Sequence, residues 1–155
     1  KNPQQKIAGV RGGIYVANPQ DWVATVNATT EYLNKTLKPE ETFFALPYDI
    51  IYYYLTGRPS PSRQTIFFEH INIPQEQEQK IIQEIEGEKV NYIVLSNRSM
   101  SPERGLGILG KTYCPVISKY INDNFIPVVR FGDWQHVPGW GWSHGTMILK
   151  RKVAL

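Results

Sequence analysis

The chain has 155 residues, of which 41% are apolar and 20% are charged, a composition typical of one globular domain that buries roughly 68–70% of its unfolded surface. Its formal net charge is +3, and basic residues cluster only at Lys150-Arg151-Lys152, so the charge pattern argues against nucleic-acid binding. The single cysteine, Cys114, excludes an internal disulfide and a zinc site built from several cysteines.

No apolar run approaches the roughly 18 residues of a membrane span, so we expect these residues to form a soluble domain. Residues 1–11 are predicted to be a polar tether and residues 12–155 a single domain. Because Lys1 is not a start methionine, we expect the chain to be a piece of a longer protein.

The first predicted unit is a strand followed by a helix. Residues 12–17 have the character of a strand, and Asn18-Pro19 then opens a helix that ends before Pro39. Its apolar residues recur near the 3.6-residue period of a helix: Trp22, Val23, Val26, Leu33 and Leu37.

The second unit is the segment FFALPYDIIYYYLTGRPSPSR, residues 43–63. Its apolar start predicts a buried strand that stops at Pro47, which has no N–H donor. Asp49 is the expected acceptor for the free N–H groups of a short aromatic helix. We expect Gly57 to end that helix in the left-handed conformation.

Two further strands and a helix complete the N-terminal pattern. Residues 65–71 predict a strand, residues 74–89 a largely polar helix with a narrow isoleucine stripe, and residues 92–97 a fourth, nearly continuous apolar strand. Strands that alternate with helices in this way are typical of an α/β sheet.

The C-terminal part predicts a helix over residues 115–124 and strands over residues 126–131 and 145–152. Because the short connection between these strands contains no helix, we expect them to be antiparallel. The predicted fold class is therefore α/β: a single-domain mixed β-sheet flanked by helices, with an antiparallel C-terminal strand pair.

The string Gly105-Leu-Gly-Ile-Leu-Gly110-Lys111-Thr112 matches two glycine-rich phosphate-binding patterns. A phosphate loop requires glycines directly after a strand and a lysine that opens a helix. Seven residues separate the predicted strand from Gly105, and Pro115 falls in the first turns of the expected helix. The spacing favours a glycine-rich surface loop over a nucleotide site.

A second string, residues 133–144, combines three of the four tryptophans with two of the three histidines. Such a loop suits stacking on a sugar ring or docking on another surface, although an aromatic loop that caps the sheet edge has the same composition. The candidate substrate-binding residues are Trp134, His136, Trp140, Trp142 and His144. No spacing in this loop specifies a metal site, and no cofactor is predicted.

Catalytic motifs are weak. The chain has no G-x-S-x-G motif, Ser143 and His144 are sequence neighbours, and Cys114 has no partner suggested by its position. A small hydrolase therefore has no identifiable nucleophile, and no general acid or base is indicated.

Four segments, taken in order, carry a family resemblance: LPYDIIYYYLTGRPSP, VNYIVLSNRS, YCPVISKYINDNFIPVVRFGDW and ILKRK. Together they resemble the soluble C-terminal region of bacterial multi-spanning glycosyltransferases of the GT-C type, similar to dolichyl-phosphate-mannose protein mannosyltransferases. The resemblance covers about residues 13–152.

This resemblance implies a division of labour within a longer chain. In such enzymes the membrane part binds the polyprenyl-phosphate sugar donor and carries the catalytic acidic residues in an early loop. The present chain would be a noncatalytic extracytoplasmic domain whose partners are the transmembrane portion of its own parent chain and a glycan or protein acceptor. The alternative is a free-standing carbohydrate- or nucleotide-binding module.

Overall fold

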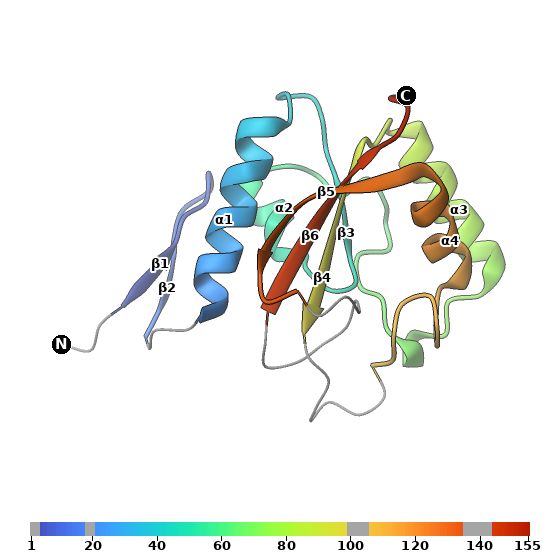
Figure 1. Ribbon diagram of the computed structural model, residues 1–155, viewed down its shortest axis with the longest axis horizontal. Helices are drawn as coiled ribbons and strands as arrows, with labels where there is room; N and C mark the ends of the chain where they lie inside the picture. The colour runs from blue at the N-terminus through green and yellow to red at the C-terminus, as the bar shows by residue number, and fades with distance from the viewer. Residues whose placement is uncertain (1–3, 18–20, 99–105, 135–143) are drawn as a thin grey trace.

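The computed structural model of the chain describes residues 4–17, 21–98, 106–134 and 144–155. Among these residues the sheet lies between two layers of helices (Figure 1). The main sheet has four strands in the order β3-β4-β6-β5: β3 (Phe44–Leu46), β4 (Tyr92–Arg98), β6 (His144–Arg151) and β5 (Phe125–Gly132). Strands β3 and β4 are parallel, whereas β6 is antiparallel to both β4 and β5. The mixed α/β sheet with an antiparallel C-terminal pair is therefore confirmed.

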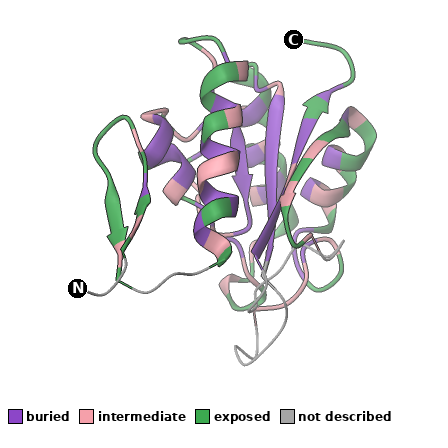
Figure 2. Cartoon of the chain, turned by 60° about the vertical axis from the view of Figure 1, so that its left-hand side comes forward, coloured by how far each residue is buried: buried purple, intermediate pink, exposed green. Residues whose placement is uncertain are grey.

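Helices α1 (Asp21–Thr36) and α2 (Ile51–Thr56) cover one face of the sheet, and α3 (Gln75–Gly87) and α4 (Pro115–Asn124) cover the other (Figure 1). Two buried clusters divide the strand residues between them: the α1 cluster, which includes Leu33, Tyr52 and Val94, and a second cluster under α3 and α4. Alternation along β4 sends Val94 toward α1 and Ile93 toward α3 and α4. Burial is accordingly concentrated in the central strands and on the inner sides of the helices (Figure 2).

A two-stranded antiparallel sheet, β1 (Gln5–Ile7) and β2 (Ile14–Val16), lies beside α1 and apart from the main sheet. Ile7 is fully buried against the α1 cluster, and the Asn27 amide of α1 bonds the backbone of Lys6 and Ala8. Part of the segment predicted as a polar tether thus pairs with the strand predicted for residues 12–17. That strand joins the hairpin and not the main sheet.

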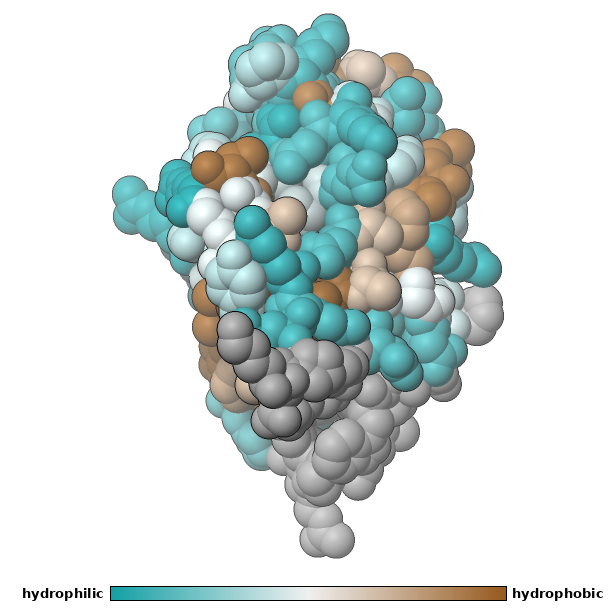
Figure 3. Space-filling view, turned by 90° about the vertical axis from the view of Figure 1, so that its left-hand side faces the viewer, coloured by the Kyte–Doolittle hydropathy of each residue, from teal (hydrophilic) through white to brown (hydrophobic). Residues whose placement is uncertain are grey.

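The hairpin side of the molecule is mostly hydrophilic, with small separate apolar areas, as Figure 3 shows. Exposed apolar side chains of the hairpin include Val10 and Tyr15. Apolar residues scattered in this way are normal on the surface of a globular protein.

The aromatic segment folds largely as its sequence predicts. Strand β3 leads to α2, which Gly57 ends in the left-handed conformation at φ 68°. Ile50 occupies the N-cap position and makes no side-chain capping bond, while the carbonyl of Asp49 accepts from the Tyr52 amide. The Arg58 guanidinium donates to the carbonyls of Leu37 and Lys38, just after α1, at 3.2 and 2.6 Å.

The prediction of a strand over residues 65–71 is wrong. Its N-terminal part is not assigned to a strand, and Glu69–Ile71 form a 3₁₀ turn, η1. The amide of Phe67 donates to the carbonyl of Pro47 at 2.8 Å. Because Pro47 has no N–H to donate in return, this contact cannot be extended into a ladder.

The remaining predicted elements are present with small changes at their ends. The helix predicted for residues 115–124 has the same bounds as α4, and the polar helix predicted for residues 74–89 is α3. Among the described residues, no helix has both the length and the apolar character required to cross a membrane.

Candidate functional site

A cavity of about 310 Å³ opens beside the α4 face of the sheet. This volume lies at the small end of the roughly 300–1,000 Å³ typical of small-molecule sites. Its walls come from the middle of β4 and β6, the loop before α4, α4 itself and the second residue after β5. The lining residues are Leu95, Ile108, Leu109, Gly110, Lys111, Ser118, Ile121, Asn122, Trp134 and Met147.

Trp134 forms one wall and also packs against the buried cluster under α3 and α4. Its position depends on Gly145 of β6, because a Cβ at that residue would lie 2.5 Å from the Trp134 amide nitrogen. Such a distance is far inside van der Waals contact, so the tryptophan segment can cross β6 only where the strand lacks a side chain. Gly145 therefore positions Trp134.

The loop before α4 forms the opposite wall. Gly110 has φ +81°, and a Cβ there would collide with the hydroxyl of Ser118. The absence of a side chain at Gly110 lets the loop lie against the first turns of α4. Glycines thus fix both the tryptophan wall and the loop wall.

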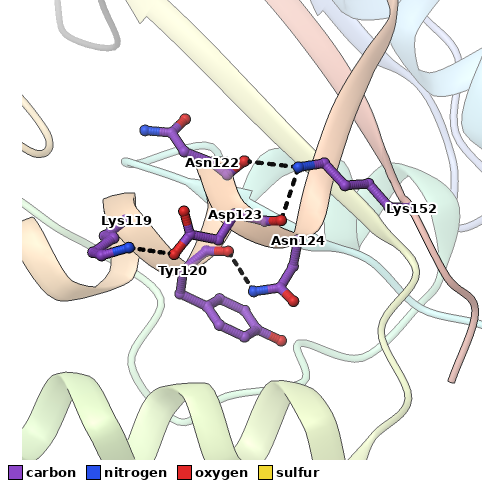
Figure 4. A network of polar contacts seen from close by, with 6 residues as sticks. All are labelled: Lys119, Tyr120, Asn122, Asp123, Asn124 and Lys152. Carbon is purple, nitrogen blue, oxygen red and sulfur yellow. Dashed lines mark hydrogen bonds and ion pairs between the residues drawn. The ribbon is translucent and has the colours of Figure 1, made fainter.

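The α4 wall presents Ser118 and Asn122, which are four residues apart and so lie on one face of the helix. At the C-terminal end of α4, Lys152 donates to the carbonyls of Asn122 and Asp123, as Figure 4 shows. The side-chain amide of Asn122 points away from this network (Figure 4). The backbone of Asn122 is therefore held while its amide remains available.

Three polar groups that line the cavity have no partner within the described part of the chain. The Ser118 hydroxyl, the Asn122 amide and the Lys111 ammonium form no side-chain hydrogen bond or ion pair there. The floor beneath them is apolar, formed by residues such as Leu95 and Ile121. A few convergent polar groups over an apolar floor are typical of a small-molecule site.

The structure describes two residues of the predicted substrate-binding set and places them on opposite sides of the sheet. Trp134 lines the cavity, whereas His144 is buried at the start of β6. His144 shares the α1 face with Thr146, whose hydroxyl lies 2.6 Å from that of Thr29 in α1. Trp134 and His144 therefore belong to opposite sides of the sheet. Predicted residues His136, Trp140 and Trp142 lie outside the described residues.

The described part of the glycine string is a loop closed on itself. The amides of Gly110, Lys111 and Thr112 donate to carbonyls within the loop, and the Ile108 amide donates to the Thr112 hydroxyl. Helix α4 begins only at Pro115. Because these N–H groups are already used, they do not form the outward-facing cradle that a phosphate loop requires.

Cys114 is unsuited to nucleophilic catalysis. Its side chain is buried, and this burial, with a smaller contribution from the negative charge of Glu78, raises the pKa of its thiol to about 12. A reactive cysteine has the opposite shift, because the thiolate is the nucleophile. In the described ranges, no group of three or more His, Cys, Asp or Glu residues is arranged to hold a metal ion.

Sequence reasoning missed Ser118 and Asn122 and associated Lys111 with a phosphate loop. A polar pair at positions i and i+4 of an amphipathic helix has the same pattern as an ordinary solvated face. The glycine next to Lys111 was the available signal, since it marks a close approach of the loop to another element.

No family model matches the chain, and the searches of curated proteins and solved structures found no significant match.

Proposed function

We propose that this chain is a saccharide-binding, noncatalytic domain, and that its cavity holds a sugar unit of the acceptor of a membrane glycosyltransferase. The observation that supports binding is the meeting of Trp134 with the Ser118 hydroxyl and the Asn122 amide around one apolar-floored cavity. Sugar rings have an apolar face that packs on an indole and hydroxyls that exchange hydrogen bonds with such groups.

The parent enzyme is inferred from the order of the sequence motifs. In this proposal the domain lies on the extracytoplasmic side of the membrane, attached to the transmembrane part that uses a polyprenyl-phosphate sugar donor. The chain alone is expected to transfer no sugar. Detectable transfer by the isolated chain would contradict the noncatalytic assignment.

The binding proposal is tested by titrating the chain with methyl mannoside, methyl glucoside and methyl glucuronide while recording tryptophan fluorescence. We expect a saturable change with at least one glycoside, because a ligand on the indole replaces water at Trp134. Trp134→Phe should weaken binding about threefold or more, since phenylalanine is smaller and has no N–H donor. Because this variant lacks the reporting indole, its affinity is measured by isothermal titration calorimetry, beside the unaltered chain.

Trp22→Phe is the matched control. Trp22 belongs to α1 on the other side of the sheet and packs against the α1 cluster. Its replacement should leave the glycoside affinity unchanged. If no glycoside gives a saturable change, or if both variants weaken binding equally, the cavity is not a saccharide site.

A free-standing carbohydrate-binding module would use the same cavity. The coding sequence upstream of Lys1 distinguishes the two forms of the proposal. Many segments of about 20 apolar residues, with an acidic first loop between them, support the membrane glycosyltransferase. A start codon directly upstream supports the free-standing module.

A further inference from the structure

The charge of the residues that line the cavity narrows the class of saccharide that the proposed site would bind. Lys111 is the only charged residue among the described residues that line it. Its ammonium forms no ion pair with the described part of the chain. The acidic sequence neighbours of two lining residues, Asp123 and Asp133, are not among the lining residues, and Asp123 pairs with Lys119 at 2.5 Å.

A second cation lies on the same face of the sheet. Arg130 of β5 is directly opposite Met147 of β6 in the strand register. Directly opposite residues of an antiparallel pair project to the same face, with Cβ atoms about 4.5–5.5 Å apart. Met147 lines the cavity, so Arg130 lies on the cavity face of the sheet next to one lining residue, without itself being one of them.

We propose that the cavity selects an acidic sugar, whose carboxylate or phosphate pairs with Lys111 while its ring packs on Trp134. This inference rests on the proposed saccharide site and adds the charge of its ligand. Asn122 and Ser118 remain to bond the sugar hydroxyls. Binding places a negative charge where the described lining supplies a cation and no carboxylate.

The test compares four probes by the same fluorescence titration: methyl glucuronide, glucose 1-phosphate, methyl glucoside and inorganic phosphate. Both acidic sugars should bind about twofold to fivefold more tightly than methyl glucoside, as expected for one charge pair with an exposed lysine. The two acidic sugars compared with each other distinguish a carboxylate from a phosphate ligand. Inorganic phosphate should bind more weakly than glucose 1-phosphate because it lacks the ring.

Lys111→Gln should remove the preference for acidic sugars, so that methyl glucuronide and methyl glucoside bind this variant with similar affinity. The matched control is Lys80→Gln, which makes the same change in net charge at an exposed lysine of α3 that does not line the cavity. Added salt provides a measurement on the unaltered chain. It should weaken glucuronide binding and leave glucoside binding nearly constant.

The outcomes separate the two proposals. Equal affinity for glucuronide and glucoside, with no effect of salt, overturns the charge selection and leaves the saccharide site intact. Inorganic phosphate that binds as tightly as glucose 1-phosphate overturns the role of the ring and reduces the site to an anion contact. If no sugar gives a saturable fluorescence change, both proposals are overturned.

Discussion

Glu78 shows how one buried side chain organises the elements around the cavity. It is only 2% exposed on α3, and its carboxylate accepts the amide proton of Ile117 in the first turn of α4 at 2.8 Å. The N-cap residue of α4, Cys114, makes no side-chain capping bond. The free N–H of α4 is therefore satisfied from a neighbouring helix.

Glu78→Ala should lower the free energy of unfolding by about 1–3 kcal/mol, because the buried Ile117 amide would lose its acceptor. Urea denaturation measures this change. Glu76→Ala provides the control, since Glu76 is exposed on the same helix and its loss should change stability by no more than about 0.5 kcal/mol. Equal losses of unfolding free energy in the two variants would contradict the capping role of Glu78.

Buried ionisable groups predict how stability responds to alkaline pH. Burial raises the pKa of the Tyr53 hydroxyl to about 12, as it does for the Cys114 thiol, from ordinary values of 10.0 and 9.0. Both groups therefore keep their protons to a higher pH in the folded chain than in the unfolded chain. The free energy of unfolding should therefore be constant with respect to these groups below about pH 9 and decrease from there toward pH 12.

The decrease should not exceed about 1.4 kcal/mol per pH unit for each group. Chemical denaturation at pH 8, 9, 10 and 11 measures it, and Cys114→Ala should reduce the slope above pH 9. A stability that stays level over this range would contradict the burial of both groups.

At the scale of elements, strong apolar patterns predicted the sheet well. The runs that form β3, β4, β5 and β6 are bounded by proline, glycine or polar residues, and α4 begins at its proline. The strand prediction for residues 65–71 failed because apolar residues indicate that a segment is buried, but not that its backbone pairs with a neighbouring strand. Phe67 is fully buried, yet its neighbour at the sheet edge is Pro47, which cannot reciprocate a ladder bond.

The candidate site was less predictable than the sheet. Trp134 was predicted from the aromatic composition of its loop. Its separation from His144 follows from the reversal of the chain between β5 and β6 and from the strand register, and sequence alone fixes neither. Ser118 and Asn122 acquire their role only because Gly110 lets the loop approach α4. Contacts between distant segments created the cavity.

A pair of glycine substitutions tests how the tryptophan wall is built. Gly145→Ala should lower the free energy of unfolding by about 1–3 kcal/mol, because the new methyl group would overlap the Trp134 backbone. It should also weaken glycoside binding, since Trp134 must move. Urea denaturation and the glycoside titration measure the two effects.

Gly87→Ala is the matched control for that substitution. It is the last residue of α3, and a Cβ there would meet nothing within 4 Å. We expect this variant to be as stable as the original chain, or up to about 1 kcal/mol more stable. Gly145→Ala with unchanged stability and unchanged binding would mean that the strand does not position Trp134.

At the scale of the whole molecule, the two faces of the sheet have different roles. The α1 face is closed by a buried cluster and by hydroxyl contacts between Thr29 and Thr146. The α4 face carries the cavity at the edge of its buried cluster. The paired strands between them support the walls that β4, β6 and α4 contribute, and a preorganised binding site is built on such regular elements.

The most direct test of the central claim is a two-dimensional NMR titration of the chain with methyl glucuronide and methyl glucoside. We expect the largest saturable shifts at the Trp134 indole N–H, the Asn122 side-chain amide and the Ser118 backbone amide, because these residues surround the cavity. Trp22 and the α1 amides should remain unchanged. Shifts spread evenly over the chain, shifts confined to the α1 face, or no shifts at all would contradict a saccharide site beside α4.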